Sequence, residues 1–267
     1  MLADKIQHID RSQQRIFYGI AALIIVCSSI ALASENILIA LLPFAIYGAV
    51  AFIYDYRLLY YSFWVALPFS IEFYFGSIGM DLPTEPIMLA LTGLGLLIFL
   101  SRLKILSFAH MRHTISLFLV LHLIWILFTA LFSQSPVVSA KFFLAKIWYV
   151  VPFYFLSFHM IRDERDIERI MKVLALFLTA AICIVLTRHA LDGFTFEGSH
   201  DVVRPIFRNH VSYASIIVVI LPFMWALYRN TNEHIARRVM LLVLTVFIVG
   251  TYFSYTRAAQ LCIVIAV

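Results

Sequence analysis

Charged residues are scarce in this sequence, at 13% of the chain against 63% hydrophobic residues. A soluble domain carries roughly 25% charged and 45–50% apolar residues, so the composition argues against a water-soluble protein. Glycine is also rare, with 9 in 267 residues. No glycine-rich phosphate loop, His-Glu-x-x-His sequence or nucleophile elbow occurs, which argues against the common soluble enzymes and against nucleotide-driven transport by this chain.

Cysteine is equally sparse, and its placement matters more than its number. Cys27, Cys183 and Cys262 all lie inside apolar segments, so neither a disulfide framework nor a thiolate metal site is predicted. The formal charge of +5 comes from basic residues in short loops between apolar runs, where they set membrane topology. No nucleic-acid partner is therefore expected.

The apolar residues form long blocks, and a helix needs about 20 such residues, with about 17 acceptable, to cross a bilayer. The sequence therefore predicts an all-α polytopic membrane protein of about ten transmembrane helices, arranged as a single transmembrane helical domain over residues 1–267. Its predicted spans are 16–33, 37–54, 58–75, 86–100, 115–132, 147–161, 171–187, 211–228 and 239–253, with a tenth from Ala258.

The tenth run has about ten residues before Val267, or about 15 Å of helix against a hydrocarbon core of about 30 Å. The chain is therefore expected to stop within a span, as the N-terminal part of a longer protein. Residues 1–33 also resemble a cleaved signal peptide, but the run 16–33 is long for one. Cleaved or not, the chain would enter its next span from the outer side.

Lysine and arginine counts give the orientation. With the N-terminus in the cytoplasm, 14 of the 20 basic residues fall in inner segments and 6 in outer ones, as the positive-inside rule requires. The positive-inside rule does not account for the basic residues in outer segments, so these residues are candidates for function. They are Lys141, Lys146, Arg188, Arg204, Arg208 and Arg257.

The predicted periplasmic loop 188–210 concentrates ionisable groups. Arg204 and Arg208 could grip an anionic lipid headgroup, since guanidinium forks suit paired phosphate oxygens, or they could contact ordinary phospholipid at the interface. Asn209 and His210 are adjacent candidates for the same substrate. His210 could act as a general base or be a satisfied interfacial histidine. The histidine and carboxylate spacing matches no metal-ligand pattern, so no metal is predicted.

Three further residues are candidates outside that loop. Arg257 lies between two apolar runs, where an anionic ligand or snorkelling to the interface would account for its charge. Glu72 and Glu85 bracket an outer segment and could orient the arginines or bind sugar hydroxyls. A purely structural turn held by Pro83 and Pro86 explains them equally well.

With these residues in view, the chain resembles the O-antigen ligase and O-antigen polymerase superfamily of bacterial integral-membrane glycosyltransferases. The span pattern and three stretches of sequence carry the resemblance. These are Pro68-Phe-Ser-Ile-Glu72 with Leu82-Pro-Thr-Glu-Pro86, then Phe207-Arg-Asn-His-Val-Ser-Tyr213, and finally Ser254-Tyr-Thr-Arg-Ala-Ala259.

The resemblance implies a multi-pass protein of the bacterial inner membrane that transfers or polymerises a glycan at the periplasmic face, with no cofactor. The donor would be an undecaprenyl diphosphate-linked glycan and the acceptor lipid A-core or another glycan, as in lipopolysaccharide biosynthesis. By motif match Arg257 would bind the carrier diphosphate, with Arg204 and Arg208 as helpers. Such proteins carry a catalytic histidine in a large periplasmic loop beyond these spans, and His210 is not carried over into that role.

The alternative is a multi-spanning transporter or flippase of a lipid-linked or anionic substrate. A transporter would place polar residues along a path near the bilayer midplane, often on interrupted helices. In this sequence the ionisable residues cluster at the predicted outer face, and the midplane positions hold little beyond His122 and His159. The enzyme is therefore the preferred interpretation.

Overall fold

The computed structural model describes residues 26–27, 30, 46, 56–75, 78–101 and 113–266. The predicted spans 16–33 and 37–54 lie outside the described residues, apart from a few isolated positions. Contacts along the chain divide it into two units, residues 1–59 and 60–267. The fold and the site belong to the second unit and to the helix that leads into it.

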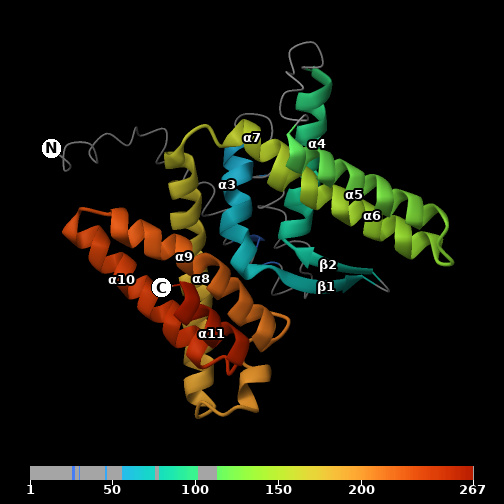
Figure 1. The fold of residues 1–267 in the computed structure, drawn as a ribbon. Helices are drawn as coiled ribbons and strands as arrows, with labels where there is room; N and C mark the ends of the chain where they lie inside the picture. The colour runs from blue at the N-terminus through green and yellow to red at the C-terminus, as the bar shows by residue number, and fades with distance from the viewer. Residues whose placement is uncertain are drawn as a thin grey trace. The chain divides into compact units, whose positions relative to one another are not determined.

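The described chain is mostly helical (Figure 1). In chain order the elements are α3 (Tyr56–Ala66), a 3₁₀ turn η1 (Leu67–Phe69), strands β1 (Ile71–Phe75) and β2 (Ile78–Leu82), α4 (Thr84–Ser101), α5 (Thr114–Leu131), α6 (Pro136–Val150), a π-helical turn η2 (Val151–Leu156), α7 (Ser157–Met160), α8 (Glu164–Leu191), a 3₁₀ turn η3 (Gly198–His200), α9 (His210–Asn230), α10 (His234–Tyr252) and α11 (Arg257–Ala266).

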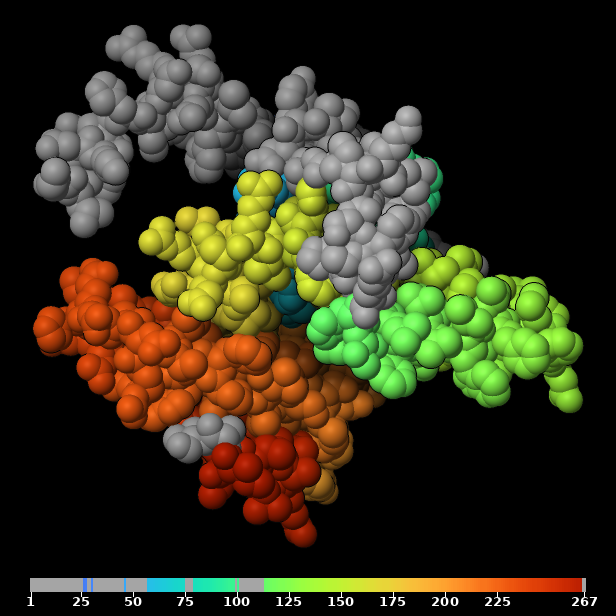
Figure 2. Space-filling model, turned by 45° about the horizontal axis from the view of Figure 1, so that its top comes forward, coloured from blue at the N-terminus to red at the C-terminus, as the bar shows by residue number. Residues whose placement is uncertain are grey.

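Five helices within the described ranges are long and apolar enough to cross a membrane: α5, the continuous helix Pro136–Met160, α8, α9 and α10. The predicted membrane-helical class is confirmed to that extent. Phe118 on α5 is 66% exposed and Trp125 is 64% exposed. In the view of Figure 2, much of the surface of α5 and α6 (green) is not covered by other helices. Such surfaces suit a hydrocarbon solvent better than water.

The boundaries of several predicted spans need correction. The spans 115–132, 171–187, 211–228 and 239–253 coincide with α5, α8, α9 and α10 to within a residue or lie inside them. The span predicted at 147–161 lies almost entirely within a 25-residue helix, Pro136–Met160. This helix begins at Pro136, since proline suits the first turn of a helix. Lys141 and Lys146 are therefore helical residues and not loop residues.

The third predicted span, 58–75, is wrong in its second half. Helix α3 ends at Ala66, and Pro68, which has no amide hydrogen, occupies the 3₁₀ turn that follows. Residues 71–75 then form β1, which pairs antiparallel with β2. The chain is therefore not purely α-helical. The run of isoleucine, phenylalanine and tyrosine is as typical of a strand as of a membrane helix.

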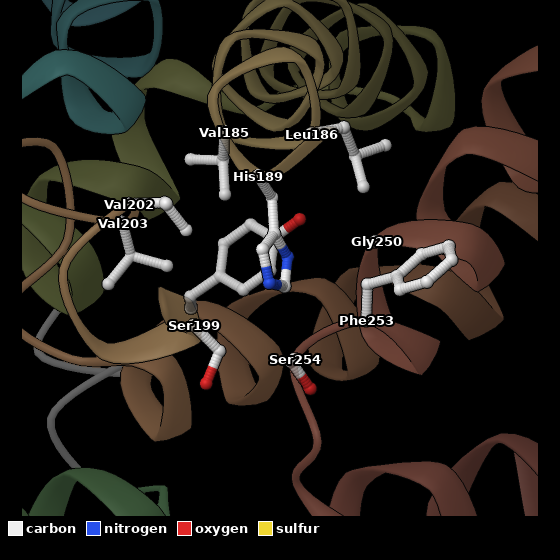
Figure 3. A pocket seen from close by; sticks show the side chains of 10 residues that line it. Val185, Leu186, His189, Ser199, Val202, Val203, Gly250, Phe253 and Ser254 are labelled. Atoms are coloured by element: carbon white, nitrogen blue, oxygen red, sulfur yellow. The ribbon is translucent and has the colours of Figure 1, made fainter. Parts of the chain in front are cut away.

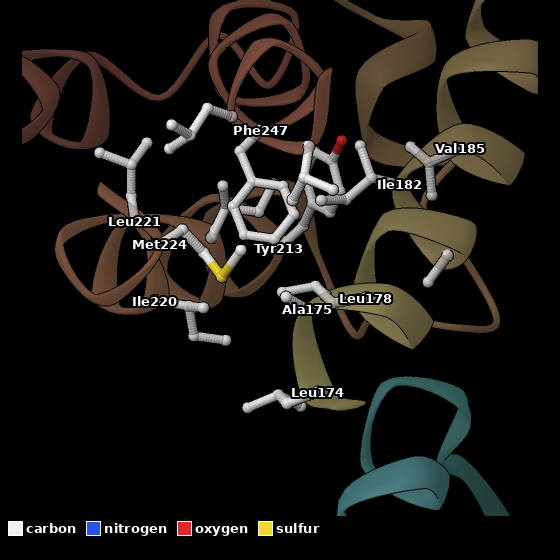
Figure 4. Packing of buried hydrophobic residues seen from close by; sticks show 14 of the residues in the cluster. Leu174, Ala175, Leu178, Ile182, Val185, Tyr213, Ile220, Leu221, Met224 and Phe247 are labelled. Atoms are coloured by element: carbon white, nitrogen blue, oxygen red, sulfur yellow. The ribbon is translucent and has the colours of Figure 1, made fainter. Parts of the chain in front are cut away.

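The core of the second unit lies between α8, α9 and α10. Leu178, Ile182, Leu221 and Phe247 are fully buried there (Figure 4). The charged segment 162–172 contains the start of α8 at Glu164, and Asp163 accepts a hydrogen bond from the amide of Asp166 at the helix N-terminus. The pair Glu168–Lys172, one turn apart, forms a salt bridge of 2.5 Å.

The segment predicted as the loop 188–210 is compact. Its first residues complete the last turn of α8, and His210 begins α9. Residues between them form turns whose apolar side chains Val202, Val203 and Phe207 belong to the core. Irregular backbone at the level of membrane helices is tolerated where it is buried in protein. This packing carries residues 204–208 back toward the middle of the fold.

Candidate functional site

The described chain contains an open cavity of about 710 Å³ that could hold a ligand. Its wall combines segments that are far apart in sequence: the end of α3, the β hairpin, α6 with η2, the middle of α8, and the residues before and within the start of α9. The polar side chains on it are those of Ser70, Glu72, Asp81, Thr84, Tyr149, Arg204, Arg208 and Ser212. The apolar side includes Phe63, Phe153, Leu174, Leu178 and Ile216.

Helix ends meet at this cavity. The first turns of α4 and α9 line it through Thr84 and Ser212, and amide groups at helix N-termini carry a partial positive charge. Leu178, near the centre of the 28-residue α8, lines the same cavity. The site therefore lies beside the middle of the longest described helix and not at its tip.

Arg208 connects the segment before α9 to the β hairpin. Its Nη2 lies 3.3 Å from Glu72 Oε1 and 3.5 Å from Asp81 Oδ2. Glu72 and Asp81 face each other directly across the two strands, an arrangement of like charges that is unfavourable by itself. The guanidinium compensates for both carboxylates. Because its side chain is 65% exposed, the bridge positions the groups more than it stabilises the fold.

Arg204 lies on the same wall, and none of the described carboxylates pairs with it. Its carbonyl oxygen accepts a hydrogen bond from Arg188 Nη1, which anchors the backbone at this point. Within the described ranges Arg204 forms no salt bridge with a carboxylate, whereas Arg208 forms two. The positive charge of Arg204 is therefore available to an anion.

The hairpin is tied to its surroundings at its base and on one side. Ser70, before β1, hydrogen-bonds the buried Thr84, which follows β2. Lys141 Nζ on α6 donates to the carbonyl of Gly79 at 3.3 Å. A side chain at Gly79 would meet Glu72 Oε1 at 2.9 Å, so glycine leaves room for that carboxylate. These contacts fix Glu72 and Asp81 at the cavity wall.

Glu85 is near this cluster but is not among the residues that line the cavity. Partial burial raises the pKa of its carboxyl above the ordinary range, and the negative charge of Asp81 raises it further. The Glu85 carboxylate therefore takes up a proton at a higher pH than an isolated glutamate would. Glu85 lies just before the predicted span 86–100.

This shift predicts a pH-dependent effect of Glu85→Gln. A carboxyl whose pKa is raised by folding costs stability when ionised, above the raised pKa, and costs nothing below its unfolded value. At pH 7.5 the variant should therefore have a melting temperature about 1 °C above that of the wild type; the increase is small because the group stays partly solvated. At pH 3.5 the two proteins should have the same melting temperature. Thermal unfolding at the two pH values measures this. A lower melting temperature at pH 7.5 would contradict it.

Asn209 and His210 have local roles at the start of α9. Asn209 Oδ1 accepts a hydrogen bond of 2.7 Å from the amide of Ser212, as an N-cap does. The ring of His210 meets that of His200 edge to face, with centroids 4.2 Å apart, and its Nδ1 has no hydrogen-bond partner among the described residues. Neither residue lines the cavity.

Arg257 also lies away from the cavity lining. It is exposed at the first position of α11, after a turn in which Tyr255 has a positive φ of 54°. Tyr255 Oη donates to the carbonyl of Phe194, which has the same φ, at 2.5 Å. The structure thus brings Glu72, Arg204 and Arg208 together at one cavity and does not add Arg257 to them there.

A second pocket, beneath this turn, is too tight to hold even a water molecule (Figure 3). The buried His189 occupies it, with Nε2 2.9 Å from the carbonyl oxygen of Thr195. Val185, Val203 and Phe253 are among its lining residues. It is a packed part of the core and not a binding site.

Asp81 is the site residue that sequence reasoning missed. The signal for it was the pairing of β1 with β2, which places Asp81 opposite Glu72. That pairing was hidden because residues 58–75 were interpreted as one helix. In the part of the chain that the structure describes, no group of three or more His, Cys, Asp or Glu side chains could hold a metal ion.

Comparison of the chain with known protein families, curated proteins and solved structures finds no match. The cavity and its residues are therefore the basis for assigning a function.

Proposed function

We propose that this protein is a membrane glycosyltransferase that moves a glycan from an undecaprenyl diphosphate carrier to an acceptor. In this reaction the bond between the anomeric carbon and the diphosphate oxygen breaks. A bond from the same carbon to an acceptor hydroxyl oxygen forms, and the acceptor proton passes to a nearby basic group. The carrier leaves as undecaprenyl diphosphate.

One observation carries the proposal: the cavity joins two arginines and two carboxylates to an apolar wall. Cations aimed at a departing diphosphate stabilise the charge that develops in the transition state, and Arg204, which pairs with none of the described carboxylates, suits that role. The apolar wall from Leu67, Phe153 and Ile216 suits the lipid end of the carrier. The acceptor would be lipid A-core or another glycan, as in the family that the sequence resembles.

The proposal includes a setting for the reaction. We place the protein in the bacterial inner membrane with about ten spans, its N-terminus in the cytoplasm and the cavity open to the periplasmic side. Membrane lipids surround it, and neither a cofactor nor a metal takes part.

A second function is favoured by the position of the cavity. It lies beside the middle of α8, and α4 and α9 begin at it. Transporters often bind their substrates near the bilayer midplane, between interrupted helices whose N-termini face anionic groups. A flippase of lipid-linked glycans would therefore use the same cavity without breaking the glycosidic bond.

An assay in lipid vesicles separates the two functions. The purified protein is reconstituted with an undecaprenyl diphosphate-linked oligosaccharide, with and without lipid A-core or a second lipid-linked glycan as acceptor. The proposed function predicts a longer glycan or a glycan-modified lipid A-core, formed with acceptor and absent from protein-free vesicles. Movement of intact donor between leaflets with no new product would instead identify a flippase and overturn the enzymatic assignment.

A further inference from the structure

The charges on the cavity wall cancel. Arg204 and Arg208 contribute two positive charges, and Glu72 and Asp81 contribute two negative ones. Arg208 is already within 3.5 Å of both carboxylates. A diphosphate that took Arg208 would displace these ion pairs and would then face two carboxylates of its own sign. Like charges brought together in this way discriminate against a ligand.

A neutral head with many hydroxyl groups meets no such obstacle. A hydroxyl donates one hydrogen bond and accepts others, carboxylate oxygens accept, and a guanidinium has five N–H donors. The hydroxyls of a sugar can therefore donate to Glu72 and Asp81 and accept from Arg208 while the ion pairs remain. A site that presents polar groups to hydroxyls rejects ligands that lack them, because the groups would otherwise be left unpaired.

The β hairpin presents groups that can bind a sugar headgroup. Gly79 leaves space for the Glu72 carboxylate and lies opposite Tyr74. Tyr74 is 70% exposed at the cavity rim, where a large aromatic side chain remains available to a ligand. Phe153 and Ile216 line the same cavity and supply an apolar wall. The volume of about 710 Å³ falls in the roughly 300–1,000 Å³ range of small-molecule sites.

We infer that Glu72 and Asp81, held in place by Arg208, form a glycan subsite that recognises the sugar hydroxyls of an amphiphilic glycolipid. The apolar wall accommodates the lipid or aglycone end. The inference rests on the proposed function, since the same cavity holds the lipid-linked substrate. It adds a division of labour, in which the carboxylates and Arg208 bind the sugar and Arg204 is left for the phosphate.

Two short amphiphiles test this division. The purified protein is held in an amphipol without sugar groups, and binding of octyl β-glucoside and octyl phosphate is measured by saturation-transfer NMR and titration. The wild-type protein should bind octyl β-glucoside through Glu72, Asp81 and Arg208, because their carboxylates and guanidinium can pair with its hydroxyls. No detectable binding of octyl β-glucoside would overturn the inference.

The variant Asp81→Asn gives a readout that a merely structural role would not move. It should weaken octyl β-glucoside binding by about tenfold and strengthen octyl phosphate binding, since it removes one repelling charge. Glu72→Gln should act in the same direction and serves if Asp81→Asn does not fold. Glu168→Gln, on the charged start of α8 and outside the cavity lining, should change neither. Equal loss of both ligands, or no change in either, would overturn the subsite.

The sugar subsite and the proposed glycan transfer can fail independently of each other. If octyl β-glucoside binds and Asp81→Asn shifts the two ligands in opposite directions but no glycan is transferred in vesicles, the subsite stands and the enzymatic proposal fails. If transfer occurs but Asp81→Asn leaves octyl β-glucoside binding unchanged, the enzyme stands and the subsite fails.

Discussion

Replacing Arg204 by glutamine is expected to lower the rate of glycan transfer by about 10²–10³-fold, the usual cost of removing one preorganised donor to a developing anion. Arg204 lies on the cavity wall and, unlike Arg208, has no carboxylate partner among the described residues. Its charge is therefore free to stabilise a departing diphosphate. Glutamine keeps a polar side chain that can donate a hydrogen bond, but it is shorter than arginine and carries no charge.

The loss should appear in catalysis and not in folding. The Arg204 side chain is exposed, and surface charges away from ion pairs change stability by roughly 0.5 kcal/mol or less. Arg204→Gln and Arg229→Gln, an exposed arginine at the opposite end of α9, should therefore melt at the wild-type temperature. Transfer in vesicles should fall for the first variant and be unchanged for the second. Wild-type transfer by Arg204→Gln would remove the phosphate-binding role from this residue.

The long apolar helices could be predicted from the sequence because hydropathy depends on composition over many residues. Thus α5, α8, α9 and α10 were located to within a few residues at most ends. The hairpin could not be predicted in this way. Ile71, Phe73 and Tyr74 favour a strand and a membrane helix alike, and their preference was decided by Pro68 together with pairing to residues 78–82. Such pairing depends on contacts between segments and leaves no periodic signal.

The residues of the candidate site likewise divide into those that residue type alone could predict and those that depend on contacts between distant segments. Arg204, Arg208 and Glu72 were predicted from residue type, and the structure brings them to one cavity. Their meeting depends on the core packing of Val203 and Phe207, which folds a segment expected to be a surface loop back beside α8. Asp81 required the strand register. The cap formed by Asn209 needed only local sequence, since asparagine before a helix is a common N-cap.

Core packing is tested most directly at Gly250 on α10. A methyl group there would meet Tyr213 Oη at 2.6 Å and Ile182 Cγ2 at 2.8 Å. Both neighbours are fully buried and have little room to move. Small residues at helix interfaces let helix backbones approach closely in membranes, so Gly250→Ala should force α10 away from α8 and α9. The expected cost is about 1–3 kcal/mol, as for other overpacked cores.

Gly93 on α4 is the matched control because a methyl group there meets nothing within 4 Å. Gly93→Ala should stabilise the protein by about 0.5–1 kcal/mol through the helix preference of alanine. The same substitution thus has opposite expected signs at two helical positions, and only the packing differs. Thermal unfolding should give a lower melting temperature for Gly250→Ala and a slightly higher one for Gly93→Ala. If Gly250→Ala melts at or above the wild-type temperature, the close approach of α8, α9 and α10 at this point is wrong, and with it the packing that positions residues 204–208 at the cavity.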